Sequence, residues 1–177
     1  FKIATGEHKE ACDVGILNEI PFFSIAGIGF DAKIAHDFSE MSGRGLKNYV
    51  KSVIKNYPKY KTQKYKIKIE DKVFSSKALF ISLANSNQFG SNASIAPQAD
   101  LQDGLIDICI MRKIPIGKAL LIFPLLFMKR MHRTKYLDII KAPEAVFYRK
   151  KGGYIHIDGD PHMIKEKVLT LSLKEKA

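Results

Sequence analysis

Residues 64–69 carry the pattern that most constrains the fold, because lysine occupies every second position and Tyr65, Ile67 and Ile69 lie between. A period of two places the apolar side chains on one face of a β-strand and the charged ones on the other. Lysines along a strand also discourage edge-to-edge pairing, so we expect an outer strand of its sheet.

Several other segments are short, apolar and bounded by glycine-rich or charged turns, which predicts further strands. The segment 78–83 is apolar enough to lie centrally in a sheet, and a short apolar stretch covers 21–26. Residues 70–72 make a turn into another predicted strand, and the remaining predicted strands are 105–111, 145–148, 154–157 and 168–173. This pattern predicts a mainly β fold: a two-sheet β-sandwich of mostly antiparallel strands with a few inserted helices.

Two helices are predicted. Gly27 and Gly29 indicate a backbone that bends or closely approaches another group, and Asp31 then has the position of an N-cap for a helix through about residue 41. Apolar residues at helical spacing in 46–57, with lysines on the other face, predict an amphipathic helix that Pro58 ends.

Composition limits the class of protein. A chain of 177 residues, 46% of them hydrophobic, can bury the core of one domain. Cys12 and Cys109 lack metal-ligand spacing, which indicates a reduced, cytosolic protein. The net charge of +11 favours anionic partners such as nucleic acid, nucleotide phosphate or acidic lipid headgroups. A solvated basic surface explains the charge equally well.

The first segment that carries chemistry is Asp158-Gly159-Asp160, which follows an alternating apolar strand. Residues at such a turn project into solvent or a cleft, so the two carboxylates are candidates for catalysis. Asp-Gly is also the commonest hairpin dipeptide, and an ordinary solvated turn stays open as the alternative.

The second segment covers residues 96–107, where Asp100, Asp103 and Asp107 lie around Gly104. Carboxylate and carbonyl oxygens are the ligands that Mg²⁺ or Ca²⁺ requires, so this loop is a candidate cation site. A turn in which Asp103 caps its own backbone is the structural alternative.

The order of these motifs resembles the C-terminal domain of the diacylglycerol kinase family of bacterial lipid kinases, to which sphingosine kinases are more distantly related. The resemblance rests on residues 27–32, 82–85, 96–107 and 158–160 in that order. It implies a two-domain lipid kinase whose N-terminal domain binds ATP through a Gly-Gly-Asp-Gly motif. That motif does not occur here, so residues 1–177 are expected to be the C-terminal β-sandwich domain alone, without kinase activity by itself.

The resemblance also implies site residues. A structural Mg²⁺ would be held by the side chain of Asp103 and the main-chain carbonyls of Asp100 and Leu105. Asp160 occupies the place of the family's general base, which is a glutamate, so its oxygen falls about 1.5 Å short. It would take the proton of the lipid hydroxyl as that hydroxyl attacks the γ-phosphoryl group of ATP.

Asp31, Asn85 and Asp158 are expected to line the substrate cleft, and the side chain of Asp160 is expected to open onto the surface that the ATP-binding domain covers. Relatives often carry three glycines where this chain has Gly90-Ser91-Asn92.

The expected partners are a lipid substrate at an acidic membrane surface, ATP and the chain's own N-terminal domain, with no nucleic acid; an oligomer is possible. The expected location is cytoplasmic and peripheral to the membrane. The apolar run 120–128 has basic residues at both ends, Lys118 on one side and Lys129, Arg130 and Arg133 on the other. It is either a membrane-interface segment or a buried helix.

Three other functions remain open. NAD kinases share the two-domain architecture, so the substrate could be a soluble nucleotide. A basic nucleic-acid-binding module would explain the charge and the tyrosines among the lysines. A metal hydrolase is the third, because His156, Asp158, Asp160 and His162 alternate along one segment and are metal-ligand types.

Overall fold

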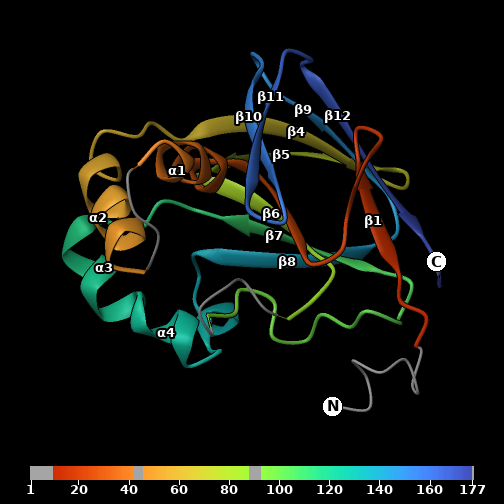
Figure 1. Ribbon diagram of the computed structural model, residues 1–177, viewed down its shortest axis with the longest axis horizontal. Helices are drawn as coiled ribbons and strands as arrows, with labels where there is room; N and C mark the ends of the chain where they lie inside the picture. Colours follow the sequence, from red (N-terminus) through yellow and green to blue (C-terminus); the bar gives the residue numbers. More distant parts are fainter. Residues whose placement is uncertain (1–9, 42–45, 88–92, 177) are drawn as a thin grey trace.

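The computed structural model describes residues 10–41, 46–87 and 93–176. It is a sandwich of two six-stranded sheets in which every strand pairing is antiparallel (Figure 1). The prediction of a mainly β, two-sheet sandwich is confirmed. Residues 90–92, where a departure from the family pattern was noted, lie outside the described residues.

The first sheet has the strand order β2-β1-β12-β9-β4-β5. Its strands are β1 (Val14–Leu17), β2 (Ile20–Phe22), β4 (Gln63–Ile69), β5 (Lys72–Ala78), β9 (Ala145–Tyr148) and β12 (Val168–Lys174).

The second sheet has the strand order β11-β10-β3-β6-β7-β8. Its strands are β3 (Ile25–Gly29), β6 (Phe80–Ala84), β7 (Ile106–Met111), β8 (Leu137–Ala142), β10 (Gly153–Ile157) and β11 (Asp160–Ile164).

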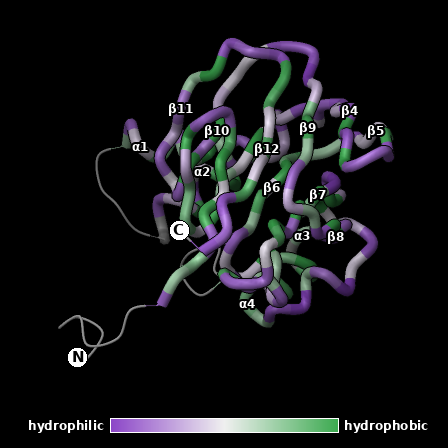
Figure 2. The backbone as a smooth tube through the Cα atoms, turned by 90° about the vertical axis from the view of Figure 1, so that its right-hand side faces the viewer, coloured by the Kyte–Doolittle hydropathy of each residue, from purple (hydrophilic) through white to green (hydrophobic). Residues whose placement is uncertain are grey.

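The main hydrophobic core lies between the two sheets and follows from the alternation of side chains. Tyr65 and Ile67 of β4 face this core, as do Ile108 and Ile110 of β7 from the other sheet. Burying one such side chain stabilises the fold by about 1.5–3 kcal/mol. In Figure 2 the hydrophobic stretches run along the strands, whereas many connecting loops are hydrophilic.

The prediction that the lysine-rich strand is an outer strand is wrong. β4 pairs with β5 on one side and β9 on the other, and β5 is the edge. The lysines of β4 are exposed on the outer face of the sheet, above the buried Tyr65 and Ile67. The alternation of lysine and apolar residues therefore predicted which face of β4 is buried, but not the position of β4 within the strand order of its sheet.

The helices cover the outer face of the second sheet and lie together on the left in Figure 1. They are α1 (Phe30–Ser39), α2 (Leu46–Asn56), α3 (Ile116–Ile122), α4 (Pro124–Phe127) and the short 3₁₀ helix η1 (Met131–Arg133). A second hydrophobic cluster fills the space beneath them and includes Phe30 and Ile34 of α1 and Cys109 of β7. The amphipathic helix predicted for 46–57 is confirmed.

The helix predicted from Asp31 begins one residue earlier, at Phe30, and Asp31 is not its N-cap. The N-cap is Gly29, whose φ of 110° is a conformation that other residues rarely adopt. Asp31 lies in the first turn and is 5% exposed.

Several strand boundaries differ from those predicted. The segment 78–83 is divided between the end of β5 and most of β6, and 21–26 is divided between β2 and β3. β6 does lie centrally in its sheet. Three strands were not predicted: β1, β8 and β11.

Candidate functional site

The hairpin of β10 and β11 carries the two candidate catalytic carboxylates at its tip. Ile157 pairs with Asp160, which leaves Asp158 and Gly159 as the two turn residues. Both have positive φ, 48° and 96°, as a two-residue hairpin turn requires. The turn chemistry that the sequence indicated is therefore present, and the roles of the two carboxylates depend on their surroundings.

The carboxylate of Asp158 is used to hold the backbone that connects β2 to β3. It accepts hydrogen bonds from the backbone nitrogens of Phe23 at 2.8 Å, Ser24 at 2.8 Å and Ile25 at 2.9 Å. Three donors to one carboxylate anchor the hairpin tip to a distant part of the chain. Asp158 therefore supports the site structurally.

Asp160 is the first residue of β11 and is exposed. It lies opposite Ile157, so both side chains project from the same face of the second sheet, the face that carries the main core. Within the described part of the chain, no hydrogen bond or ion pair to the Asp160 carboxylate is found. The expectation that this side chain opens onto the surface that an ATP-binding domain would cover stays a prediction.

The base of the same hairpin is held by Arg149, whose role the sequence did not indicate. Its guanidinium donates to the carbonyl oxygens of Gly153 at 3.3 Å, Ile164 at 2.9 Å and Glu166 at 3.1 Å. Burial lowers the pKa of this arginine. Arg149 and Asp158 thus fix the two ends of the hairpin that presents Asp160.

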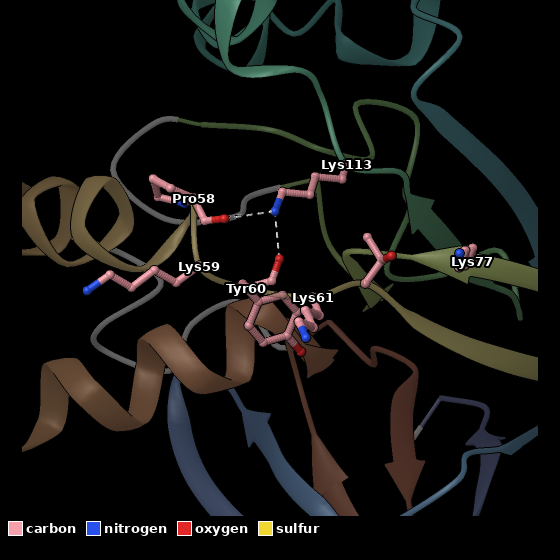
Figure 3. A pocket seen from close by; sticks show the side chains of 7 residues that line it. Pro58, Lys59, Tyr60, Lys61, Lys77 and Lys113 are labelled. Carbon is pink, nitrogen blue, oxygen red and sulfur yellow. Dashed lines mark hydrogen bonds between the residues drawn. The ribbon is translucent and has the colours of Figure 1, made fainter.

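Two surface cavities are found among the described residues, and Asp160 lines neither of them. One, of about 460 Å³, lies where the α2–β4 connection meets the segment after β7 (Figure 3). Its lining residues are Pro58, Lys59, Tyr60, Lys61, Thr62, Lys77 and Lys113. The ammonium of Lys113 is held by the carbonyl oxygens of Tyr60 at 2.6 Å and Pro58 at 3.4 Å. This cavity is strongly basic, and it is referred to below as the lysine cavity.

Asn85 is fully buried at the end of β6. Its side-chain nitrogen donates to the carbonyl oxygens of Asp13 at 2.8 Å and Phe23 at 2.9 Å. Asn85 and Asp158 therefore hold the same β2–β3 connection from two sides. Both side chains hold backbone groups, and their predicted place in a substrate cleft stays a prediction.

Asp31, in the first turn of α1, places its buried side chain against the other face of the second sheet. Its Oδ2 atom accepts a hydrogen bond from the Ser82 hydroxyl at 3.1 Å and lies 3.3 Å from Nε2 of His156, which is also buried. Gly27 makes room for this pair, because a Cβ atom there would lie 2.2 Å from Nε2 of His156 and 2.3 Å from Oδ2 of Asp31. The close approach predicted for this glycine is explained by the buried pair.

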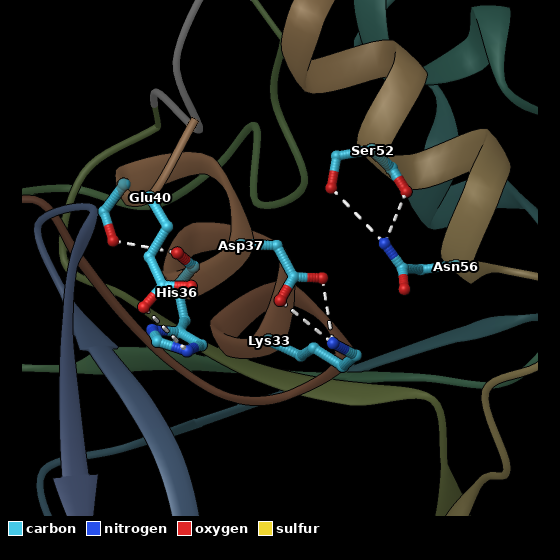
Figure 4. Close-up of polar contacts among 7 residues, drawn as sticks. Lys33, His36, Asp37, Glu40, Ser52 and Asn56 are labelled. Carbon is cyan, nitrogen blue, oxygen red and sulfur yellow. Dashed lines mark hydrogen bonds and ion pairs between the residues drawn. The ribbon is translucent and has the colours of Figure 1, made fainter. Parts of the chain in front are cut away.

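The exposed side of α1 carries ordinary surface contacts. Lys33 pairs with Asp37 at 2.8 Å and His36 with Glu40 at 3.8 Å (Figure 4). The ring of His36 also stacks on Tyr154 of β10, with centroids 3.9 Å apart. α1 therefore packs against the hairpin by this ring contact as well as by its buried face.

The acidic loop after residue 96 is tied to both ends of the described chain by Asp13, which the sequence did not single out. The buried Asp13 carboxylate accepts from the backbone nitrogens of Gly104 at 2.8 Å and Lys176 at 3.0 Å. The backbone nitrogen of Asp13 donates to the carbonyl of Leu101 at 2.7 Å. Nothing in the local sequence distinguishes Asp13, because its partners come from distant segments.

The side chains of Asp100 and Asp103 in this loop already have partners. Oδ1 of Asp103 accepts from the backbone nitrogen of Leu105 at 3.1 Å, so the self-capping turn is present. Oδ2 of Asp103 lies 2.6 Å from the ammonium of Lys141. The carboxylate of Asp100 accepts from the backbone nitrogen of Gln102 at 3.0 Å.

Oxygen donors suited to Mg²⁺ are therefore present, but the Asp103 carboxylate is paired with a cation of the chain itself. In this arrangement the loop does not fit Mg²⁺ unless Lys141 moves. The hydrogen bond to Asp103 raises the pKa of Lys141, which keeps its positive charge. The magnesium site of Asp100, Asp103 and Leu105 stays a prediction.

The four residues that suggested a metal hydrolase are not assembled into a metal site. His156 is buried against Asp31, and Asp158 holds backbone nitrogens. No group of three or more histidine, cysteine or acidic side chains that could hold a metal ion occurs within the described ranges.

The apolar run 120–128 covers the end of α3, all of α4 and the residues next to α4. Ala119, Ile122, Leu125 and Leu126 pack against the second hydrophobic cluster. The other side is exposed and apolar, with Ile116 61%, Leu121 77%, Phe123 39%, Phe127 42% and Met128 55% exposed. Among the helices of the described residues, none has the length and apolar character needed to cross a membrane.

Comparison with known proteins adds a family and a fold. The family model described as the YegS C-terminal NAD kinase beta sandwich-like domain matches residues 24–168. No curated protein matches the sequence.

Three similar solved structures are of proteins assigned as diacylglycerol kinases from Bacillus anthracis strain Sterne. They are 20%, 17% and 20% identical, with TM-scores of 0.72, 0.66 and 0.70 over 99% of the chain. The chain covers 58%, 54% and 57% of those chains, so it spans less than two thirds of their length. At these identities the likeness shows the fold alone.

Proposed function

The chain belongs to the family of YegS C-terminal NAD kinase beta sandwich-like domains, and on that basis we propose that it is the C-terminal domain of an ATP-dependent lipid kinase. The proposed substrate is a diacylglycerol-like lipid with a free hydroxyl group. The names of the similar solved structures support this substrate class over a soluble nucleotide.

The observation that carries the proposal is the difference between the two carboxylates of the β10–β11 hairpin. Asp158 accepts hydrogen bonds from three backbone nitrogens, whereas Asp160, the first residue of β11, is exposed. A carboxylate that is anchored through its neighbour and open to solvent can act as a general base. Asp160 would take the hydroxyl proton while the lipid oxygen bonds to the γ-phosphorus of ATP and the bond to ADP breaks.

We propose that a second, N-terminal domain binds ATP and its Mg²⁺ ion and closes the cleft above Asp160. The similar solved structures are longer than this chain, which is consistent with such a partner domain. The magnesium that accompanies ATP would offset the phosphate charge in the transition state. Residues 1–177 alone are then inactive.

The lipid substrate would be reached at an acidic membrane surface, where the domain associates peripherally on the cytoplasmic side. The exposed apolar side chains of α3 and α4 support this proposal. Exposed basic residues lie close to them in the sequence: Lys118 within α3, and Lys129, Arg130 and Arg133 after α4. The lysine cavity adds four cations beside the segment that leads into α3. Apolar insertion combined with attraction to acidic headgroups is how interfacial segments bind.

The catalytic role is tested in the full-length protein with diacylglycerol and, separately, NAD as acceptor. Asp160→Asn should lower kcat at least about 100-fold, and Asp160→Glu should retain activity. Unfolding midpoints should match the wild type, because no partner of the Asp160 carboxylate is found among the described residues. Full activity of Asp160→Asn would refute its role as the base, and phosphorylation of NAD instead of lipid would move the protein to the NAD kinase class.

Membrane association is tested by co-sedimentation with phosphatidylglycerol and phosphatidylcholine vesicles. Replacing Leu121 and Phe127 by serine should reduce binding to the acidic vesicles. Ile54→Ser is the matched control, because Ile54 is 68% exposed but lies on α2. Equal binding to both vesicle types, or an equal loss with Ile54→Ser, would contradict the proposed surface.

A further inference from the structure

The ammonium group of Lys141 has three oxygen neighbours, all supplied by residues 98–107. Its Nζ atom lies 2.6 Å from Oδ2 of Asp103, 3.2 Å from the carbonyl oxygen of Gln98 and 3.6 Å from Oδ1 of Asp107. Two of these oxygens belong to carboxylates. Such an all-oxygen, anionic surrounding is what a hard divalent cation requires.

Asp107 distinguishes this cluster from an ordinary surface ion pair. It lies in the interior of the second sheet on β7, its side chain is 3% exposed, and its Oδ1 atom has no hydrogen-bond partner within the described ranges. Lys141 is its direct cross-strand neighbour on β8. A buried carboxylate needs a nearby positive charge, and Lys141 supplies it.

The cluster is accessible from solvent. A cavity of about 360 Å³ opens beside it and is lined by Pro97, Gln98, Asp107, His132, Ile139 and Lys141. The Lys141 side chain is 36% exposed. An ion from solution could therefore reach the carboxylates if the ammonium group were absent.

We propose that Lys141 is a tethered cation that fills a divalent-cation site made by Asp103, Asp107 and the carbonyl of Gln98. The ammonium holds the loop that carries Asp103 against β7 and β8, so the loop does not depend on a bound metal ion. Removal of the ammonium uncovers a site for Mg²⁺ or Ca²⁺. This inference does not rest on kinase activity, and it shares only Asp103 with the magnesium site expected from the sequence.

The test compares melting temperatures of the purified chain in EDTA, in excess Mg²⁺ and in excess Ca²⁺. The wild type should melt at the same temperature in all three. Lys141→Met removes the charge at similar length, and in EDTA its melting temperature should fall by about 2–6 °C. Either ion should restore part of this loss, and calorimetric titration with Ca²⁺ should show one site in the variant alone.

Three further variants define the site. Lys141→Arg keeps the positive charge and should remain indifferent to divalent ions. Lys68→Met removes an exposed lysine of β4 and is the charge-matched control, which should not respond either. Adding Asp103→Asn to Lys141→Met should abolish the response, because a ligand carboxylate is lost.

The proposal is overturned if Mg²⁺ or Ca²⁺ stabilises the wild type as much as Lys141→Met. It is also overturned if folded Lys141→Met does not respond to either ion. If Lys141→Met does not fold, Lys141→Gln is measured in its place, and failure of both variants to fold in excess Ca²⁺ counts against the proposal.

Discussion

Asp158 and Ile25, which are 133 positions apart, form two hydrogen bonds with each other. The backbone nitrogen of Asp158 donates to the carbonyl of Ile25 at 2.9 Å, and the backbone nitrogen of Ile25 donates to Oδ1 of Asp158 at 2.9 Å. The turn that presents Asp160 is therefore fixed to the start of β3 by main chain and side chain together. The carboxylate of Asp158 therefore holds backbone, whereas that of Asp160, on the other side of Gly159, is exposed.

Removing the Asp158 carboxylate should destabilise the fold. Asp158→Gly keeps a residue that tolerates the φ of 48° but leaves three backbone nitrogens without their acceptor. The free energy of unfolding should fall by about 2–4 kcal/mol, measured by urea denaturation. Asp158→Asn keeps one acceptor oxygen and should lose less. A Gly variant as stable as the wild type would show that these bonds do not support the hairpin.

Gly27→Ala should also be destabilising, because the new methyl group would overlap both His156 and Asp31. The expected loss is about 1–3 kcal/mol or more, again from urea denaturation. Gly117→Ala is the control, since a Cβ atom at Gly117 in α3 meets nothing within 4 Å. Equal stabilities of the two variants would contradict the close approach at Gly27.

The two cysteines should differ in reactivity. Cys109 is fully buried in β7, and burial raises the pKa of its thiol, so little thiolate forms. Cys12 is partly exposed. Titration with a chromogenic disulfide should detect one thiol in the native chain and two in denaturant. Rapid reaction of both in the native chain would show that β7 opens readily.

Alkaline pH should weaken the fold through its buried tyrosines. Burial raises the pKa of Tyr49 from 10.0 to about 12, and burial also raises the pKa of Tyr57, Tyr60 and Tyr65. A raised folded-state pKa contributes stability that is complete below pH 10 and is lost as pH rises through the folded value.

The unfolding free energy should therefore fall between pH 10 and about pH 12, and tyrosinate absorption should rise with unfolding. Tyr49→Phe should make this decline less steep. A decline equally steep in that variant would exclude a contribution from Tyr49.

Elements with a regular local pattern could be predicted from the sequence. The lysine alternation in 64–69 identified β4, and helical spacing identified α2, because side-chain direction follows directly from backbone geometry. The Asp-Gly turn was recognised for the same local reason. β11 was missed because Pro161 and polar residues hide its alternation, and the edge position assigned to β4 was wrong because pairing partners are distant in sequence.

Some features of the candidate site could likewise be predicted from neighbouring residues, whereas others depend on contacts between distant segments. Residue order alone indicated the sandwich, the hairpin and the acidic loop, because turn chemistry and alternation act over a few neighbouring residues. Only the folded chain decided that Asp158 is consumed by backbone nitrogens, that Asp31 pairs with His156, and that Lys141 occupies the acidic loop. Those choices depend on hydrogen bonds and charges between segments that are distant in the sequence and meet only in the folded structure.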